Sequence, residues 1–302
     1  MLDVPPRFGI PHACHLWVGT PISDLVYAVL AHGNSAPYKV PLTSTFRLTP
    51  TPLGSPQPSS MAQPRLVSLA FFVAGLISGA HSTTFSFKNN CPYPVWPASL
   101  ANAGKAAFSP TGFQLDSGAS LALDAPPAWS GRMWARHRCS TDSSGRFSCL
   151  SGDCGTGQVA CSGAGGATPT TLVEFTLQGG GGKDFYDVSC VDGFNVPVSV
   201  VPSGGSNCDS TSCPTNINAR CPTELQMMAP DGSVVGCKSA CIAFGTDQYC
   251  CRGKYGSPDT CKPTGYSKMF KDACPQAYSY AYDDKSSTFT CAGANYDITY
   301  CP

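Results

Sequence analysis

The chain has 302 residues, of which 42% are hydrophobic and 13% are charged, and its formal net charge is +0. The charged fraction is about half of that in a typical soluble domain, so no basic surface is available to attract nucleic acid or an anionic membrane. The chain also contains 18 cysteines, far more than a protein of the reducing cytosol normally carries, and we therefore expect it to fold in an oxidising compartment.

The first 60 residues are rich in Pro, Ser and Thr and have no sustained hydrophobic period. This composition is typical of weakly structured sequence, or of untranslated sequence that has been read as protein. His12, Cys14 and His15 are potential metal ligands, but three ligands in an unstructured arm do not indicate a metal site. We expect residues 1–60 to be an upstream extension that is either disordered or a gene-model artefact.

Residues 61–82 have the parts of a secretory signal peptide. A basic start, MAQPR, is followed by the apolar run LVSLAFFVAGLISGA and by small residues at Ala80 and Ser82. The run is shorter than the roughly 20 residues that span a bilayer, so we expect no stable membrane anchor. We expect Met61 to be the initiator and Thr83 to begin the mature chain. N-terminal sequencing of the natural protein tests this, because any residue before Met61 would contradict it.

From Thr83 onward, short runs of alternating apolar and polar residues are separated by Gly, Pro and Asn at intervals of about eight to twelve residues. This pattern predicts a β-sandwich or a β-barrel. Cysteines then crowd together among Gly, Pro, Ser and Asp, which predicts a disulfide-rich lobe over about 215–274, with a short helix at Ser239–Phe244. Residues 287–302 return to strand-like alternation and are expected to rejoin the sheet.

Residues 171–195 predict an antiparallel hairpin whose turn is formed by four glycines, Gly179 to Gly182. A symmetric closure about these glycines places Glu174 directly opposite Asp187. The alternating neighbours Val173, Phe175, Leu177, Tyr186, Val188 and Cys190 then fall on the core face. Like charges directly opposite each other destabilise a sheet, so a fold would rarely keep this pair for stability. The alternative is a solvated face on which rotation of the side chains separates the two charges.

Seventeen of the cysteines lie between Cys91 and Cys301. Zinc binding is the alternative to disulfides, but the adjacent Cys250 and Cys251 and the irregular gaps elsewhere do not form repeated CxxC pairs. The only histidine after residue 82 is His137, which leaves little material for a mixed Cys and His site or a histidine-based triad. We expect disulfides, with no metal and no cofactor.

From Thr83 to Pro302 the chain resembles the thaumatin-like proteins, the plant pathogenesis-related group that includes osmotin and zeamatin. The matching segments are NNCPYPVW at Asn89, GRMWAR at Gly131, GRFSCLSGDC at Gly145, TLVEF at Thr171, DFYDVSCVDGFNVP at Asp184, INARCP at Ile217, QYCC at Gln248, KMFKDACPQAYSYAYDD at Lys268 and YDITYCP at Tyr296. The resemblance implies a mainly β fold for residues 83–302, a flattened β-sandwich of about eleven strands with a disulfide-rich lobe of loops and helices. A cleft is expected between the two.

The resemblance also implies eight disulfides. They join Cys91 to Cys301, Cys139 to Cys149, Cys154 to Cys161, Cys208 to Cys291, Cys213 to Cys274, Cys221 to Cys237, Cys241 to Cys250 and Cys251 to Cys261. Cys190 departs from the family, where an apolar residue usually stands. Because strand parity places it on the core face, we interpret it as a buried free thiol, with a reactive or intermolecular cysteine as the alternative.

The family members with antifungal or glucanase activity share a cleft built from one arginine, one glutamate and three aspartates. The corresponding positions in this chain are Arg132, Glu174, Asp187, Asp192 and Asp284. Strict alternation would bury Asp192, so we expect the strand to bend near Val191–Gly193. Arg136 is a weaker candidate for the role of Arg132, and Asp283 for that of Asp284. Three phenylalanines are candidates for stacking on sugar rings, with a core position as the alternative for each: Phe185, Phe194 and Phe270.

Such carboxylates suit glycoside hydrolysis, with Glu174 as the acid, Asp192 as nucleophile or base, and Asp187 setting the electrostatics. Three functions stay open: a weak endo-β-1,3-glucanase, a binding protein without turnover for β-1,3-glucan or for a membrane receptor of fungi, and an inhibitor of foreign glycanases or proteases. We favour an antifungal defence protein, secreted to the apoplast and monomeric. Its expected partner is β-1,3-glucan or another fungal cell-wall polysaccharide, and not nucleic acid.

Overall fold

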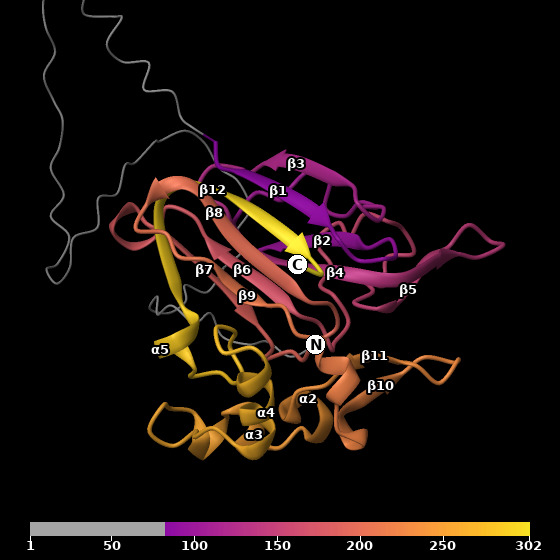
Figure 1. Ribbon diagram of the computed structural model, residues 1–302, viewed down its shortest axis with the longest axis vertical. Helices are drawn as coiled ribbons and strands as arrows, with labels where there is room; N and C mark the ends of the chain where they lie inside the picture. The colour runs from indigo at the N-terminus through magenta and orange to yellow at the C-terminus, as the bar shows by residue number, and fades with distance from the viewer. Residues whose placement is uncertain (1–81) are drawn as a thin grey trace, which may run out of the picture. The chain divides into compact units, whose positions relative to one another are not determined.

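The structure is a computed structural model that describes residues 82–302 (Figure 1). The upstream extension, and the signal peptide up to residue 81, lie outside the described residues. The strands are β1 (Thr84–Asn89), β2 (Trp96–Ala101), β3 (Ser120–Asp124), β4 (Ser130–Thr141), β5 (Phe147–Ser151), β6 (Leu172–Thr176), β7 (Asp184–Ser189), β8 (Val198–Ser206), β9 (Thr211–Cys213), β10 (Gln226–Met228), β11 (Val234–Cys237) and β12 (Phe289–Tyr300).

Ten of these strands form one curled sheet that folds into two layers (Figure 1). The first layer contains β2, β4, β6 and β7 in this order, with β5 paired to the far end of β4. The second contains β3, β1, β12, β8 and β9. All neighbours are antiparallel except β1 and β12, which run parallel. The mainly β sandwich that we predicted is therefore confirmed.

The last strand, β12, connects the two layers. Its first residues, Phe289–Cys291, pair with β7 of the first layer. Its later residues pair with β8, and from Tyr296 onward they also pair with β1 on the other side. β12 therefore lies in the centre of the second layer and closes the sandwich at one end.

The core between the layers is aromatic. The rings of Phe85 and Tyr296 come from the second layer and that of Phe175 from the first, and all three are almost fully buried. The centroid of the Phe175 ring lies 4.7 Å from that of Phe85 and 4.8 Å from that of Tyr296, in edge-to-face arrangements. Aromatic pairs of this kind contribute about 0.5–1.5 kcal/mol each beyond the burial of their surface. Alternation along the strands places these rings inward.

The hairpin of β6 and β7 closes through a 3-10 turn at Gly180–Gly182. Gly181 and Gly182 have φ angles of +68° and +72°, a conformation that glycine adopts without steric cost. The buried carboxylate of Asp184 accepts hydrogen bonds from the backbone N–H of Gln178, at 2.9 Å, and from the hydroxyl of Tyr296, at 2.8 Å. The turn is therefore tied to the second layer, which fixes the register of the hairpin.

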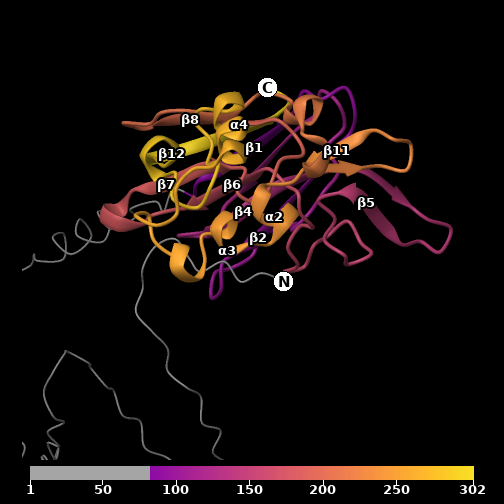
Figure 2. The same ribbon diagram turned by 90° about the horizontal axis from the view of Figure 1, so that it is seen from below.

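A lobe of short helices and loops follows β9 and lies below the strands in Figure 1, and in front of them when seen from below in Figure 2. Its helices are the 3-10 helices η2 (Ile217–Arg220), η3 (Thr223–Leu225) and η4 (Gly253–Tyr255), and the α-helices α2 (Ala240–Phe244), α3 (Asp247–Cys250), α4 (Gly265–Ala273) and α5 (Asp284–Ser287). The predicted short helix is α2: the hydroxyl of Ser239 accepts from the N–H of Ile242, and Gly245 ends it. We did not predict α4, which begins at a capping box of Thr264 and Ser267.

The disulfides in residues 82–302 are the eight pairs that the family resemblance implies. Cys91–Cys301 links the beginning of the sandwich to its end across a sequence separation of 210 residues. Cys213–Cys274 ties β9 to the residue that follows α4, and Cys208–Cys291 ties the loop after β8 to β12. The lobe is thus covalently attached to β9 of the second layer.

Cys190 is the free cysteine of the described chain, and it is fully buried with its sulfur 4.0 Å from that of Cys213. Burial raises the pKa of the Cys190 thiol to about 12, so it is protonated and unreactive in the folded state. We expect the chain that begins at Thr83 to show no reactive thiol when folded at neutral pH. Denaturation without reductant should expose one thiol per molecule, on the peptide that contains Cys190. A count of zero in a monomer would contradict this prediction.

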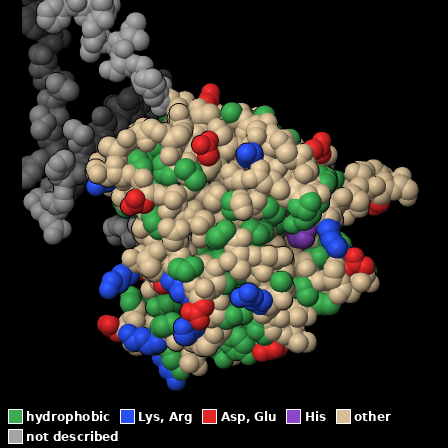
Figure 3. Space-filling view, viewed as in Figure 1, with side chains coloured by type: hydrophobic (Ala, Val, Ile, Leu, Met, Phe, Trp, Pro, Cys, Tyr) green, Lys and Arg blue, Asp and Glu red, His purple; other side chains and the backbone are tan. Residues whose placement is uncertain are grey.

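The charged side chains are unevenly distributed over the surface. In the face shown in Figure 3, most of the Lys and Arg side chains lie over the lobe, whereas the charged side chains over the sandwich are mainly scattered Asp and Glu.

Candidate functional site

The candidate site is on the outer face of the first layer, where β4, β6 and β7 run side by side. Arg132 of β4 lies opposite Glu174 of β6, and Glu174 lies opposite Asp187 of β7. Residues directly opposite each other in antiparallel strands share one face, and the adjacent Val173 and Val188 are buried in the core. Arg132, Glu174 and Asp187 therefore form a line across three strands, which we call the acidic row. The register of its two carboxylates is the one that the sequence predicts.

Asp192 follows the end of β7, in a tight turn. The N–H of Gly193 donates to the carbonyl oxygen of Cys190 at 2.9 Å, and Gly193 has a φ angle of +90°. A Cβ atom at Gly193 would lie 2.5 Å from the Cβ of Pro169, so only glycine fits there. The strand thus bends near Val191–Gly193, as we predicted. The side chain of Asp192 is half-buried and does not lie in the core.

Asp284 approaches the acidic row from the lobe, as the first residue of α5. Its Oδ1 accepts a hydrogen bond of 2.7 Å from the hydroxyl of Tyr278. Asp283, the alternative to Asp284, is engaged differently: its Oδ2 lies 2.9 Å from Nζ of Lys271 and accepts from the N–H and the hydroxyl of Ser279. Asp283 therefore maintains the local structure, and Asp284, which is exposed, is the better candidate for the site.

Tyr278 connects Asp284 to the acidic row. We did not predict Tyr278 as a residue of the site. Its hydroxyl also bonds to that of Thr288, which precedes the β12 residue paired with Tyr186 and so lies beside Asp187. The phenol has a single proton, which it donates to Asp284, so Thr288 is the donor to Tyr278. Burial raises the pKa of Tyr278, as do its hydrogen bond to Asp284 and the negative charges of Asp187 and Asp284, while the Thr288 bond lowers it. The phenol is neutral at physiological pH.

Two of the three candidate phenylalanines belong to the core, which corrects our expectation for them. Phe194 is fully buried and Phe270 has 2% of its surface exposed, and both contribute to the main hydrophobic cluster. Neither can present a ring face to a sugar. Phe185, half-buried on the same face of β7 as Asp187, is the one that stays in the candidate site.

Arg136 is also a core residue and does not compete with Arg132 for the site. Its guanidinium is fully buried, donates to the carbonyl oxygens of Trp96 and Val159, and lies 5.4 Å from the ring centroid of Phe147. Burial lowers the pKa of Arg136 to about 10, so it keeps its charge at neutral pH.

Arg132 makes no salt bridge within the described part of the chain. The ion pairs of residues 82–302 join Arg138 to Asp231, Lys268 to Asp272 and Lys271 to Asp283. Arg132 is in none of these pairs, although the strand pairing places it next to Glu174.

His137 has a structural role. It is buried, and its Nε2 lies 3.1 Å from the carbonyl oxygen of Val235 on β11. Because a carbonyl only accepts hydrogen bonds, Nε2 carries the proton, and the ring joins β4 to the lobe. Burial lowers the pKa of His137, and the charge of neighbouring Arg138 adds to this effect, while the bond to Val235 opposes it.

This lowered pKa predicts a loss of stability in acid. The unfolded chain binds a proton at His137 more readily than the folded chain, so the contribution of this residue is complete above the unfolded pKa of about 6.5 and falls as the pH drops below it. We expect the melting temperature of the wild type to fall more steeply from about pH 7 to about pH 5 than that of His137→Gln, whose amide donates but does not titrate. Equal slopes in thermal unfolding would contradict this.

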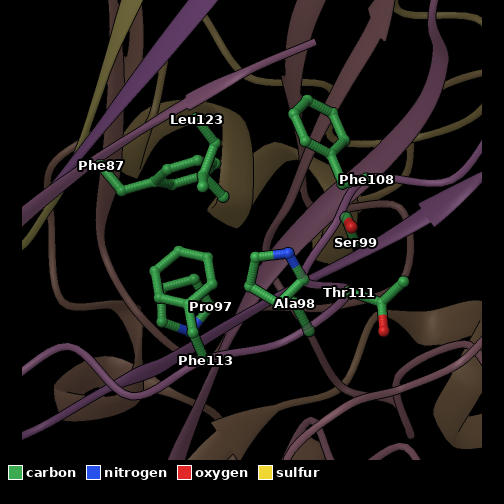
Figure 4. Close-up of a pocket in the computed structure, with 9 residues that line it drawn as sticks. Phe87, Pro97, Ala98, Ser99, Phe108, Thr111, Phe113 and Leu123 are labelled. Carbon is green, nitrogen blue, oxygen red and sulfur yellow. The ribbon is translucent and has the colours of Figure 1, made fainter. Parts of the chain in front are cut away.

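Other features of the described chain do not point to a different site. No group of three or more His, Cys, Asp or Glu side chains in residues 82–302 is arranged to hold a metal ion. No helix in this range is long and apolar enough to cross a membrane. A small pocket on the sandwich is lined mainly by apolar side chains, including Phe87, Phe108 and Phe113 (Figure 4), and it contains no acid or base.

These observations define a disulfide-rich β-sandwich protein with paired carboxylates on one face. Residues 89–302 match the sequence profile of the Thaumatin family, and the chain belongs to this family. It is 57% identical over 239 residues to thaumatin-like protein 1 of Pyrus pyrifolia, covering 78% of this chain and 98% of the relative. It is 59% identical over 226 residues to a glucan endo-1,3-beta-glucosidase of Prunus avium, with coverages of 74% and 92%. It is 53% identical over 238 residues to pathogenesis-related protein 5 of Arabidopsis thaliana, with coverages of 78% and 97%.

Proposed function

We propose that this chain binds β-1,3-glucan at the acidic row, together with Asp192 and Asp284. The observation that carries the proposal is the direct pairing of Glu174 with Asp187 across two antiparallel strands. Opposed like charges cost stability, so their presence on a half-buried face is better explained by a ligand than by the fold. The hydroxyl groups of a glucan chain are suitable donors to such carboxylates. Phe185 offers the neighbouring ring face, and Arg132 a positive donor.

A slow hydrolysis of the bound glucan is the second candidate, and the same pair favours it. Glycoside hydrolysis uses one carboxyl group to protonate the glycosidic oxygen and a second to attack the sugar or to activate water. We assign Glu174 as this acid, Asp192 as the nucleophile or base, and Asp187 as the group that sets the local electrostatics. The relative from Prunus avium, which is named as a glucan endo-1,3-beta-glucosidase, supports this candidate.

We also propose that the protein is a secreted, monomeric, antifungal defence protein of the apoplast. Eight disulfides need an oxidising compartment, which supports secretion. The relative named pathogenesis-related protein 5 supports the defence role. Signal-peptide cleavage before Thr83 is part of this proposal.

Two assays on the chain that begins at Thr83 test the function. Co-sedimentation with insoluble β-1,3-glucan measures binding, and release of reducing sugar from laminarin measures hydrolysis. We expect binding that is lost in Glu174→Gln/Asp187→Asn and retained in the surface control Asp297→Asn. Binding without sugar release would leave a binding protein. The absence of both would overturn the proposal and favour the alternatives, an inhibitor of foreign glycanases or proteases, or a protein that acts on a fungal receptor.

A further inference from the structure

Lys271 of α4 is a lysine whose three ammonium donors are all engaged inside the lobe. Its Nζ lies 2.9 Å from Oδ2 of Asp283, from the carbonyl oxygen of Ala277 and from the hydroxyl oxygen of Ser287. An ammonium has three protons, so these contacts use every donor. Ser287 is fully buried, and the side chain of Lys271 is 24% exposed. The three acceptors all belong to residues 277–287, the segment that connects α4 to β12.

This segment is attached to β7 directly beside the acidic row. The N–H of Tyr278 donates to the carbonyl oxygen of Val188 at 2.9 Å, and the N–H of Cys190 donates to the carbonyl oxygen of Tyr278 at 2.8 Å. These two bonds extend the sheet by one short parallel bridge, between Ser189 and Tyr278. Val188 is the neighbour of Asp187 in the chain. The position of residues 277–287 therefore determines which of their side chains lie near the carboxylate of Asp187.

The same segment carries Asp284, which the hydroxyl of Tyr278 holds at 2.7 Å. The negative charges of Asp187 and Asp284 both raise the pKa of this phenol, so both carboxylates lie near it. The three hydrogen bonds of Lys271 go to other residues. It holds Ala277, Asp283 and Ser287, which flank Tyr278 and Asp284 in the chain.

We propose that Lys271 is a positioning residue for the site: by holding residues 277–287 through three hydrogen bonds, it fixes where Asp284 stands relative to Asp187. The inference rests on the proposed function for its effect on glucan. The clamp itself, which we define as Lys271 with its three acceptors, can be measured without glucan.

The test compares Lys271→Met with Lys268→Met, on the chain that begins at Thr83. Both changes remove one positive charge from α4 and keep a long side chain. Lys268 is 71% exposed and its ion pair is with Asp272 on the same helix, so its loss should leave the site undisturbed. Lys271→Arg is the rescue variant, because it restores a charged donor at this position.

Hydrogen exchange reports on the clamp. In Lys271→Met we expect the amides of Tyr278 and Cys190 to exchange about tenfold faster, because a charge-assisted hydrogen bond is lost and the segment opens locally. The amides of Tyr296 and Ile298 in β12 should keep their rates. Lys268→Met should match the wild type, and Lys271→Arg should recover part of the protection. Unchanged exchange at Tyr278 and Cys190 in Lys271→Met would overturn the clamp.

Glucan binding reports on the positioning. We expect Lys271→Met to bind laminarin about tenfold more weakly and with a shifted pH profile, since Asp284 would no longer be held in place relative to Asp187. Faster exchange together with an unaltered laminarin affinity and pH profile would reduce Lys271 to a stabilising residue and overturn the inference. If the wild type does not bind laminarin, the proposed function has failed, the positioning role for glucan fails with it, and the exchange rates still decide whether the clamp exists.

Discussion

The Glu174→Gln variant is expected to lose laminarin hydrolysis by a factor of about 10² to 10⁴, the usual contribution of a general acid. The amide has nearly the same shape as the carboxyl group but supplies no acidic proton. Because the change also removes one of two opposed negative charges, the melting temperature should stay the same or rise slightly. Loss of activity together with retained stability would separate a chemical role from a structural one. Reducing-sugar release and thermal unfolding measure the two effects.

The matched control for this prediction is Asp297→Asn. Asp297 is an exposed acid on β12, on the outer face of the second layer. Its substitution by Asn removes one negative charge, as Glu174→Gln does. This control should hydrolyse laminarin like the wild type. If Glu174→Gln also does so, the catalytic assignment is wrong, and laminarin affinity then decides whether the acidic row binds glucan at all.

Reduction of the eight disulfides is expected to unfold the chain that begins at Thr83. A disulfide typically contributes about 2 to 4 kcal/mol by restricting the unfolded chain. The net stability of a domain is about 5 to 15 kcal/mol, so the loss of several bridges exceeds it even if their effects are not additive. Circular dichroism during heating, with and without a reductant under otherwise identical conditions, measures this. A reduced protein that melts within a few degrees of the oxidised one would contradict the prediction.

The hairpin of the acidic row could be predicted from sequence because its information is local. The glycines fix the turn, and alternation then determines which side chains share a face, so the pairing of Glu174 with Asp187 follows without knowledge of the rest of the chain. The turn at Asp192 could be inferred from the need to avoid a buried acid. The assignment of disulfides and of the remaining site residues depended on the family resemblance, because spacing alone does not give connectivity.

What the sequence did not show depends on contacts between distant segments. Phe194 and Phe270 lie in segments without clear alternation, and only the packing of the lobe on the sandwich decides that both are buried. Tyr278 was missed for the same reason: its importance arises from two backbone bonds to β7, some 90 residues earlier in the chain. Three tyrosines, Tyr278, Tyr280 and Tyr282, precede the two adjacent aspartates, and nothing in the local sequence distinguishes Tyr278 from the other two.

The parallel pairing of β1 with β12 has a consequence for how the molecule forms. Before β12 is present, β1 with β3 and β8 with β9 are separate two-stranded pairs, each with an open edge where β12 will lie. Contacts across roughly the whole domain must then form at once, which makes folding slow and leaves the incomplete layer prone to aggregation. A nascent chain therefore cannot complete its second layer until the residues of β12, Phe289–Tyr300, have been synthesised and released. Chaperones that shield exposed strand edges should bind the nascent chain up to this moment and release it afterwards.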